Sequence, residues 1–241
     1  MTDSPKLWVL VPAAGAGRRM GAEIPKQYLP LAGKTVLEVT LEKLQSVPGI
    51  QEVVVALAED DVFFSTLDCS RSVTRIVGGA ERADSVYQGL LWLKAKGRDS
   101  DWVLVHDAAR PCVRVDNIQR LIDQTTAANC GGILAAPVAD TLKKASSTHI
   151  AHTVSREHLW AAHTPQMFRL GDLYSALANA FGAEVLVTDE ASAIEHAGGK
   201  VLLVADSRDN IKITQPEDLG LAEQILLSQL ASSTTAFQEP K

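Results

Sequence analysis

The chain has few cysteines, few aromatic residues and no long uncharged apolar run. Its three cysteines, Cys69, Cys112 and Cys130, lie far apart and show no Cys-x-x-Cys spacing. A sparse, odd set of this kind argues against a disulfide framework and against a structural zinc site. We therefore expect free thiols in a reducing compartment. No uncharged stretch approaches the roughly 18 apolar residues that span a membrane.

Positive charge is also in short supply. Lys and Arg number 23 against 29 Asp and Glu, which gives a formal net charge of -6 at pH 7. This balance argues against long-range attraction to DNA or RNA, so we expect no nucleic-acid partner and no membrane partner. Asp3 and Pro5 precede the first apolar run, and Arg18 and Arg19 follow it. These residues do not suit a secretory leader, and we expect a cytoplasmic protein.

The amino-terminal segment combines a buried strand with a cationic loop of small residues. Residues 7–11 are five consecutive apolar residues stopped by a proline, which is typical of a buried parallel strand. The loop that follows has small residues at 13–17 and three cations, Arg18, Arg19 and Lys26, within nine positions. Because small residues let backbone N–H groups approach an anion, this loop predicts a phosphate site.

Strand-like and helix-like segments alternate along the chain. Apolar runs predict further strands at 52–58, 73–77, 102–106, 131–137 and 201–204. Apolar periodicity and capping residues predict helices at 35–46, 83–96, from 116, 170–181, 189–197 and 214–230, with a short helix after 59–61. This alternation predicts an α/β fold with a Rossmann-like wound, mainly parallel sheet. We expect one domain over residues 1–241.

One segment, at about 138–164, breaks this alternation. It has two short runs, 141–144 and 150–154, on either side of a turn at 146–148, which indicates a protruding β-hairpin arm. Long irregular connections in compact domains are usually functional, and an isolated hairpin is only marginally stable. We therefore expect the arm to pack on a second copy of the chain and form a homodimer.

Ligands of a wound parallel sheet bind beyond the carboxyl ends of its strands. Gly15-x-Gly17-x-x-Met20 lacks the third glycine of the dinucleotide fingerprint, and no Ser-His-Asp or Cys-His order stands out. Cations, small residues and isolated acids suit nucleotidyl transfer, where cations and a metal ion stabilise charge on the phosphates. The residues expected at these ends are Gly15, Gly17, Arg18, Arg19, Lys26, Gly79, Arg82, Ser85, Asp107, Arg110, Asp140, Thr141, Asp209 and Lys212.

Six motifs carry a resemblance to a known family over about residues 7–226. They are Ala13-Ala14-Gly15-Ala16-Gly17-Arg18-Arg19-Met20, Pro25-Lys26-Gln27-Tyr28, Gly78-Gly79-x-x-Arg82-x-x-Ser85, His106-Asp107-Ala108-Ala109-Arg110-Pro111, Thr188-Asp189-Glu190 and Asn210-Ile211-Lys212. Together they resemble the 2-C-methyl-D-erythritol 4-phosphate cytidylyltransferase family of the non-mevalonate isoprenoid pathway. The resemblance implies a nucleotidyltransferase-type fold and transfer of CMP from CTP to this polyol phosphate, with Mg²⁺ or another divalent cation.

The resemblance also implies residue roles. Arg19 and Lys26 would stabilise the α-phosphate in the transition state, and Arg156 and Lys212 would position the acceptor. The implied CTP-binding residues are Ala13, Ala14, Gly15, Ala16, Gly17, Gly79, Ala80, Ser85 and Asp107. The implied acceptor-binding residues are Asp107, Arg110, Thr141, Arg156, Thr164, Thr188 and Lys212. In this family the arm interlocks two subunits, and Arg156 serves the neighbouring subunit's site.

Several alternatives stay open. Asp107 is the metal-side candidate, acting mainly through the CTP phosphates, but it could simply hold a turn. Ala80 stands where the family often has Asp, so only its backbone is expected to contact CTP. Asp189 and Glu190 could cap a helix or contact substrate. For the whole chain, the alternatives are a ribitol 5-phosphate cytidylyltransferase and a non-catalytic nucleotide-binding regulator.

Overall fold

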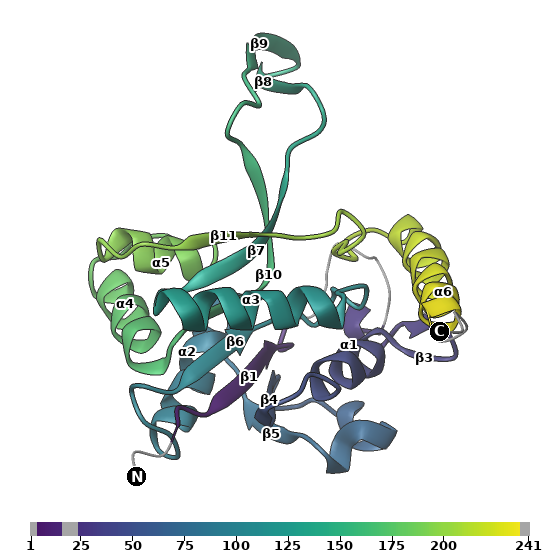
Figure 1. The fold of residues 1–241 in the computed structure, drawn as a ribbon, viewed down its shortest axis with the longest axis vertical. Coiled ribbons are helices and arrows are strands. Elements are labelled where there is room, and N and C mark those ends of the chain that lie inside the picture. The colour runs from purple at the N-terminus through teal and green to yellow at the C-terminus, as the bar shows by residue number, and fades with distance from the viewer. Residues whose placement is uncertain (1–3, 16–23, 237–241) are drawn as a thin grey trace.

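A seven-stranded sheet forms the centre of the molecule (Figure 1). The computed structural model describes residues 4–15 and 24–236. The strand order is β11-β7-β10-β6-β1-β4-β5, and β10 alone runs antiparallel to its two neighbours within this sheet. The strands are β1 (Leu7–Pro12), β4 (Ile50–Leu57), β5 (Thr74–Val77), β6 (Trp102–Val105), β7 (Gly132–Pro137), β10 (Trp160–Arg169) and β11 (Leu202–Ala205). The predicted wound, mainly parallel sheet is confirmed.

Helices cover both faces of the sheet. Val9 and Val11 of β1 pack with α1 and α3 on one face, whereas Trp8 and Leu10 pack with α2, α4 and α5 on the other. Because neighbouring side chains of a strand point to opposite faces, burial on both faces explains the unbroken apolar run of β1. The helices are α1 (Val36–Gln45), α2 (Arg82–Lys94), α3 (Val115–Ala128), α4 (Leu170–Gly182), α5 (Glu190–His196) and α6 (Glu217–Ala236).

Smaller elements complete the fold. The short helix predicted after 59–61 consists of two 3₁₀ turns, and another such turn carries Lys26. These elements are η2 (Lys26–Tyr28), η3 (Phe64–Thr66), η4 (Asp68–Arg71) and the paired strands β2 (Pro30–Leu31) and β3 (Lys34–Thr35). In the ranges that the structure describes, no helix has both the length and the apolar character needed to cross a bilayer.

The sequence did not predict β10, although this strand lies inside the sheet between β7 and β6. Its residues 163–166 are His, Thr, Pro and Gln rather than a run of apolar residues, and all four are buried. Gln166 shows how the buried polar groups are satisfied, since it donates to Asp189 Oδ2 at 2.8 Å and accepts from Ala191 N at 2.9 Å. Hydrogen-bond partners outside the strand therefore allow these polar residues to be buried. The strand consequently lacks the hydrophobic pattern by which strands are predicted.

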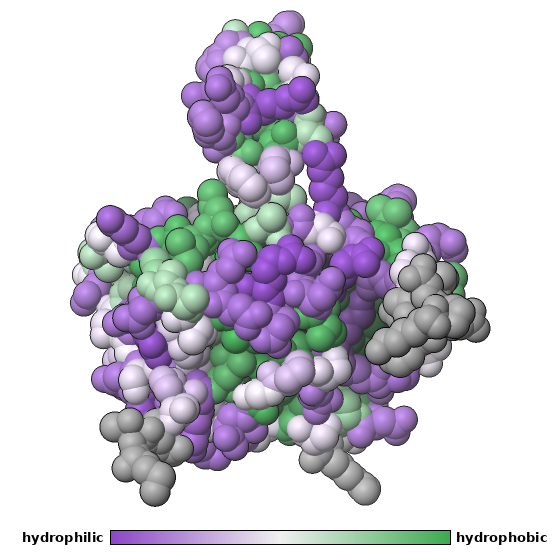
Figure 2. All heavy atoms as spheres, in the orientation of Figure 1, coloured by the Kyte–Doolittle hydropathy of each residue, from purple (hydrophilic) through white to green (hydrophobic). Residues whose placement is uncertain are grey.

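The predicted hairpin arm is present. Strands β8 (Leu142–Ser146) and β9 (His149–Val154) pair antiparallel and project away from the body of the molecule (Figure 1). Most of their side chains are exposed, and Figure 2 shows hydrophilic and hydrophobic residues mixed over the arm. The arm therefore gains little stability from packing against its own chain.

Candidate active site

A cavity of about 310 Å³ lies beyond the carboxyl ends of β1, β5 and β6. This is the edge of the sheet at which the sequence predicts ligand binding. The residues with a predicted role that line the cavity are Ala13, Ala14, Gly15, Lys26, Ala80, Ser85, Asp107 and Lys212. Its other lining residues are Pro12, Gln27, Glu81, Arg82, Ala108, Ala109 and Thr214.

The loop after β5 is shaped by a close backbone approach. Gly79 N donates to Ser85 Oγ at 3.0 Å, and Ser85 Oγ also donates at 3.1 Å to the carbonyl of Glu81, the residue that caps the start of α2. A Cβ on Gly79 would lie only 2.2 Å from the Cβ of Asp84. Gly79 therefore shapes this loop by leaving room for α2, which brings Ala80 and Ser85 to the cavity.

The 3₁₀ turn η2 joins the loop after β1 to the segment before α6. Gln27 is buried and donates through Nε2 to Ala13 O at 2.8 Å. Lys26 donates through Nζ to Ile213 O at 3.2 Å, next to Lys212. The turn thus places one predicted catalytic cation beside a second one, although the two are 186 positions apart in the sequence.

Asp107 is surrounded by cations. Arg82 Nε lies 2.8 Å from its Oδ1, Lys212 Nζ lies 2.8 Å from its Oδ2, and Arg110 Nε lies 3.5 Å from Oδ2. Burial alone would raise the pKa of Asp107, but the three cations hold that pKa well below its usual range. Asp107 is therefore ionised at neutral pH and fixes the cations that surround the cavity.

Glu190 is the second anion of this cluster. Its carboxylate accepts from Arg82 Nη1 at 2.7 Å and from Nη2 at 3.0 Å. Burial would lower the pKa of Arg82, but Glu190 and Asp107 raise it above its ordinary value. At the start of α5, Asp189 caps the helix by accepting from Ser192 N, and Glu190 pairs with Arg82. Sequence reasoning placed Arg82 at the strand ends but gave it no role.

Thr164 and His106 lie behind Asp107. Thr164 Oγ1 accepts from Asp107 N at 3.0 Å and lies 3.0 Å from His106 Nδ1, while His106 Nε2 lies 3.1 Å from Arg110 O. A carbonyl can only accept, so Nε2 carries the proton and Thr164 donates to Nδ1. Burial lowers the pKa of His106 to about 4, so the ring is neutral at pH 7. The two side chains together hold the Asp107 turn.

Five predicted acceptor-binding residues do not line this cavity, namely Arg110, Thr141, Arg156, Thr164 and Thr188. Thr141 directly precedes β8 and Arg156 follows β9, so both lie on the arm, where Arg156 donates to Ala139 O. Thr188 lies in the exposed loop before α5, and its backbone N donates to Ser192 Oγ. Arg110 and Thr164 contact Asp107 from outside the cavity, as described above. The predicted Ala16, Gly17 and Arg19 lie outside the described residues.

The described part of the chain forms no cluster of three His, Cys, Asp or Glu side chains suited to a metal ion. Asp107 and Glu81 are the carboxylates among the residues that line the cavity. Each Asp107 oxygen already faces a cation, but a carboxylate offers about four acceptor sites in all. Mg²⁺ commonly binds one or two carboxylates together with substrate phosphates, and Asp107 suits that mode.

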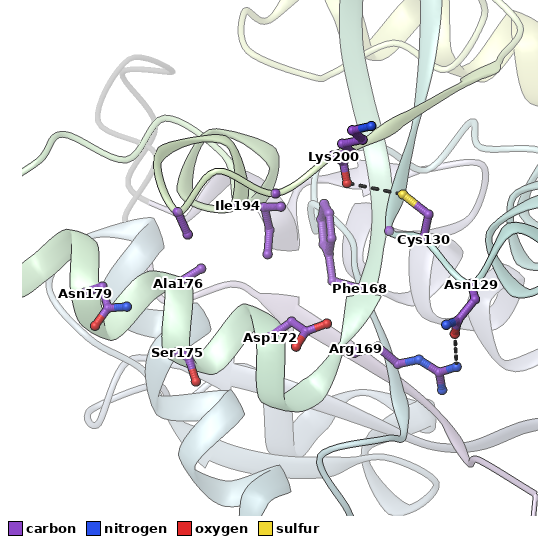
Figure 3. Close-up of a pocket in the computed structure, with 13 residues that line it drawn as sticks. Asn129, Cys130, Phe168, Arg169, Asp172, Ser175, Ala176, Asn179, Ile194 and Lys200 are labelled. Carbon is purple, nitrogen blue, oxygen red and sulfur yellow. Dashed lines mark hydrogen bonds between the residues drawn. The ribbon is translucent and has the colours of Figure 1, made fainter.

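A second cavity, of about 410 Å³, lies at the opposite edge of the sheet between α4, α5 and the starts of β7 and β11 (Figure 3). Phe168, Ala176 and Ile194 form its apolar wall, and Arg169 turns aside to donate to Asn129 Oδ1 at 2.7 Å. It contains none of the predicted site residues. Its volume is similar to that of the first cavity, but the cluster of cations around a buried acid is found only at the first.

Comparison with known proteins agrees with the geometry. The model of the family described as 2-C-methyl-D-erythritol 4-phosphate cytidylyltransferase matches residues 7–228. The chain belongs to this family. A cytidylyltransferase of that name from Vibrio parahaemolyticus is 55% identical over 217 residues, which is 89% of this chain and 92% of the relative. One from Pseudomonas paraeruginosa is 51% identical over 222 residues, covering 90% and 95%.

Solved structures of 2-C-methyl-D-erythritol 4-phosphate cytidylyltransferases share the fold. The crystal structure of the enzyme from Francisella tularensis has a TM-score of 0.80 and 38% sequence identity, and the match covers 91% of this chain and 99% of that one. A structure described as 4-diphosphocytidyl-2C-methyl-D-erythritol synthase has a TM-score of 0.82 and 39% identity, covering 93% and 100%. The expected nucleotidyltransferase-type fold is confirmed.

Proposed function

We propose that this chain transfers CMP from CTP to 2-C-methyl-D-erythritol 4-phosphate in isoprenoid precursor biosynthesis, and that the cavity beyond β1, β5 and β6 is where it does so. Family membership supports the activity. The observation that carries the site is the cluster of Arg82, Arg110 and Lys212 around Asp107, beside Lys26. Cations held at this place suit the two substrates because both carry negatively charged phosphate groups.

The reaction forms one bond and breaks one. An oxygen of the acceptor phosphate attacks the α-phosphorus of CTP, and the bond from that phosphorus to the bridging oxygen breaks to release pyrophosphate. The acceptor phosphate is already ionised at neutral pH, so no strong general base is needed. The protein instead supplies alignment and fixed positive charge, because negative charge builds up on the phosphate oxygens during transfer.

The residues divide between the two substrates. We assign the triphosphate and base to the backbone at 13–17 and around Gly79, Ala80 and Ser85. Lys26 and Arg19 act on the charge that develops at the α-phosphate. We assign Asp107 and Lys212 to the place where the acceptor meets CTP, and the implied acceptor residues are Arg110, Thr141, Arg156, Thr164 and Thr188. Since the Thr164 hydroxyl already bonds Asp107 and His106, we assign it a supporting role.

A divalent cation, Mg²⁺ in the first instance, completes the site. Asp107 and the CTP phosphates would both bind this ion. The Asp107 carboxylate is ionised at neutral pH, as a ligand of a divalent cation must be. When bound, the ion neutralises phosphate charge as a Lewis acid. Asp107 also keeps Lys212 and Arg82 in place, so the same carboxylate orders the cations of the protein.

The arm supports a homodimer in which each site is completed by the other subunit. Thr141 and Arg156 lie on the arm rather than at the cavity, and the arm and its base expose Ile150, Leu159 and Trp160. Exposed apolar side chains on a projecting hairpin suit a protein partner. A second copy would bury them and would bring Arg156 to its neighbour's acceptor.

Mixed dimers test the shared site. Refolding Lys26→Ala and Arg156→Ala chains together should give about a quarter of wild-type activity, because half of the dimers are mixed and one of their two sites is intact. Each variant alone should be nearly inactive. If Arg156 served its own subunit's site, both sites of the mixed dimer would carry a lesion and no activity would return. A monomeric mass at micromolar concentration would also contradict the shared site.

The acceptor is tested by pyrophosphate release from CTP. We expect release with 2-C-methyl-D-erythritol 4-phosphate and little with ribitol 5-phosphate. The opposite preference would support a ribitol 5-phosphate cytidylyltransferase, and no release with any acceptor would support a nucleotide-binding regulator. The free thiols and net charge of -6 support a cytoplasmic location and no nucleic-acid or membrane partner.

A further inference from the structure

Lys212 is carried by a segment that lies alongside the loop of Asp107. Ile213 N donates to Ala109 O at 2.8 Å, and Arg110 Nη1 donates to Asn210 O at 2.6 Å. These bonds align residues 209–213 with residues 107–114. The same bonds hold the backbone from which the Lys212 side chain reaches Asp107 at 2.8 Å.

Arg114 and Asp209, at the ends of these two aligned segments, form an ion pair outside the cavity. Arg114 donates to Asp209 Oδ2 through Nε at 2.9 Å and through Nη2 at 2.6 Å. Arg114 is also the residue that directly precedes and caps α3, since its carbonyl accepts from Asn117 N and Ile118 N. The pair therefore ties the segment of Lys212 to the start of a rigid 14-residue helix.

Two more helices support the same pair. Gln229 of α6 donates to Asp209 Oδ2 at 3.3 Å and to Cys112 O at 2.8 Å. Lys43 of α1 donates to Gln229 Oε1 at 2.5 Å and to Val113 O at 3.1 Å. Asp209 and its partners thus connect both loops to three helices, and none of these residues lines the cavity.

The turn between Asp209 and Lys212 is short and tightly held. Ile211 N donates to Asp209 O at 2.8 Å. The amide of Asn210 donates to Thr164 O at 2.9 Å and to Asp206 Oδ2 at 2.7 Å. Two residues separate Asp209 from Lys212, and hydrogen bonds hold the turn that they form. A displacement of Asp209 would therefore move the backbone of Lys212.

We propose that the Arg114–Asp209 ion pair is a positioning device for Lys212 in the transfer reaction. Neither residue touches the cavity, and the pair acts by fixing the backbone from which Lys212 reaches Asp107. This inference rests on the proposed function of the cavity. It adds Arg114 to the site and gives a positioning role to Asp209, which the sequence places at the strand ends without a role.

The test is a double-mutant cycle in the full-length chain. Asp209→Asn keeps the shape of the side chain and removes its charge, and Arg114→Gln breaks the pair from the other side. Each should lower kcat/KM for 2-C-methyl-D-erythritol 4-phosphate by about 10-fold while the KM for CTP stays within about twofold. In a Lys212→Ala background each should lower the remaining kcat/KM by less than about twofold, because the residue through which they act is gone.

Controls separate positioning from general stability. Asp99→Asn breaks the exposed Lys94–Asp99 ion pair and should leave kcat/KM unchanged. Arg114→Lys keeps the charge and should lose less activity than Arg114→Gln. Equal losses in wild-type and Lys212→Ala backgrounds, or no loss in either, would overturn the inference. A wild-type chain that turns over no acceptor would instead refute the proposed function.

Discussion

The Glu190→Gln substitution tests the ion-pair network that shapes the site. The side chain of Glu190 is 2% exposed, and both of its oxygens accept from Arg82. The substitution keeps the shape of the side chain but removes its charge. Arg82 would keep Asp107 as a partner and would lose the anion that fixes its other two nitrogens.

The size of the effect follows from burial. Breaking a fully buried ion pair costs about 3–5 kcal/mol, because the remaining charge is left without a partner. Arg82 keeps Asp107 as a partner and its side chain is 28% exposed, so its charge stays partly compensated and the lower end, about 3 kcal/mol, is expected. In a chain of this length each kcal/mol lowers the melting temperature by roughly 2–4 °C, which predicts a fall of roughly 6–12 °C.

Calorimetry and turnover measure the two consequences. The melting temperature should fall as calculated, and kcat/KM should fall by about 10-fold because Arg82 lines the cavity. Glu42→Gln is the matched control, since it breaks the half-exposed Lys34–Glu42 pair and should change stability by less than about 1 kcal/mol. A melting temperature within about 2 °C of wild type would refute the reasoning about the buried pair.

Three further predictions follow from the same site. Lys26→Ala should lose most turnover and keep the wild-type melting temperature, whereas near-normal turnover would contradict its assigned role. Chelation with EDTA should abolish turnover, and Mg²⁺ should restore it. Full activity in EDTA would show that turnover needs no divalent cation. The pKa of His106 is about 4 when folded and about 6.5 in an unfolded chain, so acidification protonates the unfolded chain first. The free energy of unfolding should therefore fall by about 2 kcal/mol between pH 7 and pH 5 from this group, and urea unfolding of His106→Gln should show a correspondingly smaller fall.

Much of the fold could be predicted because its strands are buried on both faces. The run at 7–11 is apolar without interruption, and the structure packs alternate side chains of β1 against helices on either face. The general rule for wound sheets then brings Lys26, Asp107 and Lys212 together at one edge, which the sequence alone could suggest. Strand β10 escaped prediction because its buried polar residues are satisfied by partners that are distant in the sequence.

The electrostatic network could not be predicted in the same way. An arginine and a glutamate 108 positions apart, such as Arg82 and Glu190, give no periodic signal, and only the fold shows that they pair. The Arg114–Asp209 pair is equally invisible in the sequence. In contrast, the arm was predictable as a hairpin because it breaks the alternation of strands and helices, and its role in a dimer stays a prediction.

The most direct test of the central claim is a ³¹P NMR time course with CTP, Mg²⁺ and 2-C-methyl-D-erythritol 4-phosphate. We predict that signals of CTP and the acceptor phosphate decline together while a cytidine diphosphodiester and pyrophosphate appear in equal amounts. The two phosphates of the new diester come from different substrates, one from CTP and the other from the acceptor. Unchanged spectra, or a diester that forms only when ribitol 5-phosphate replaces the acceptor, would contradict the proposed function.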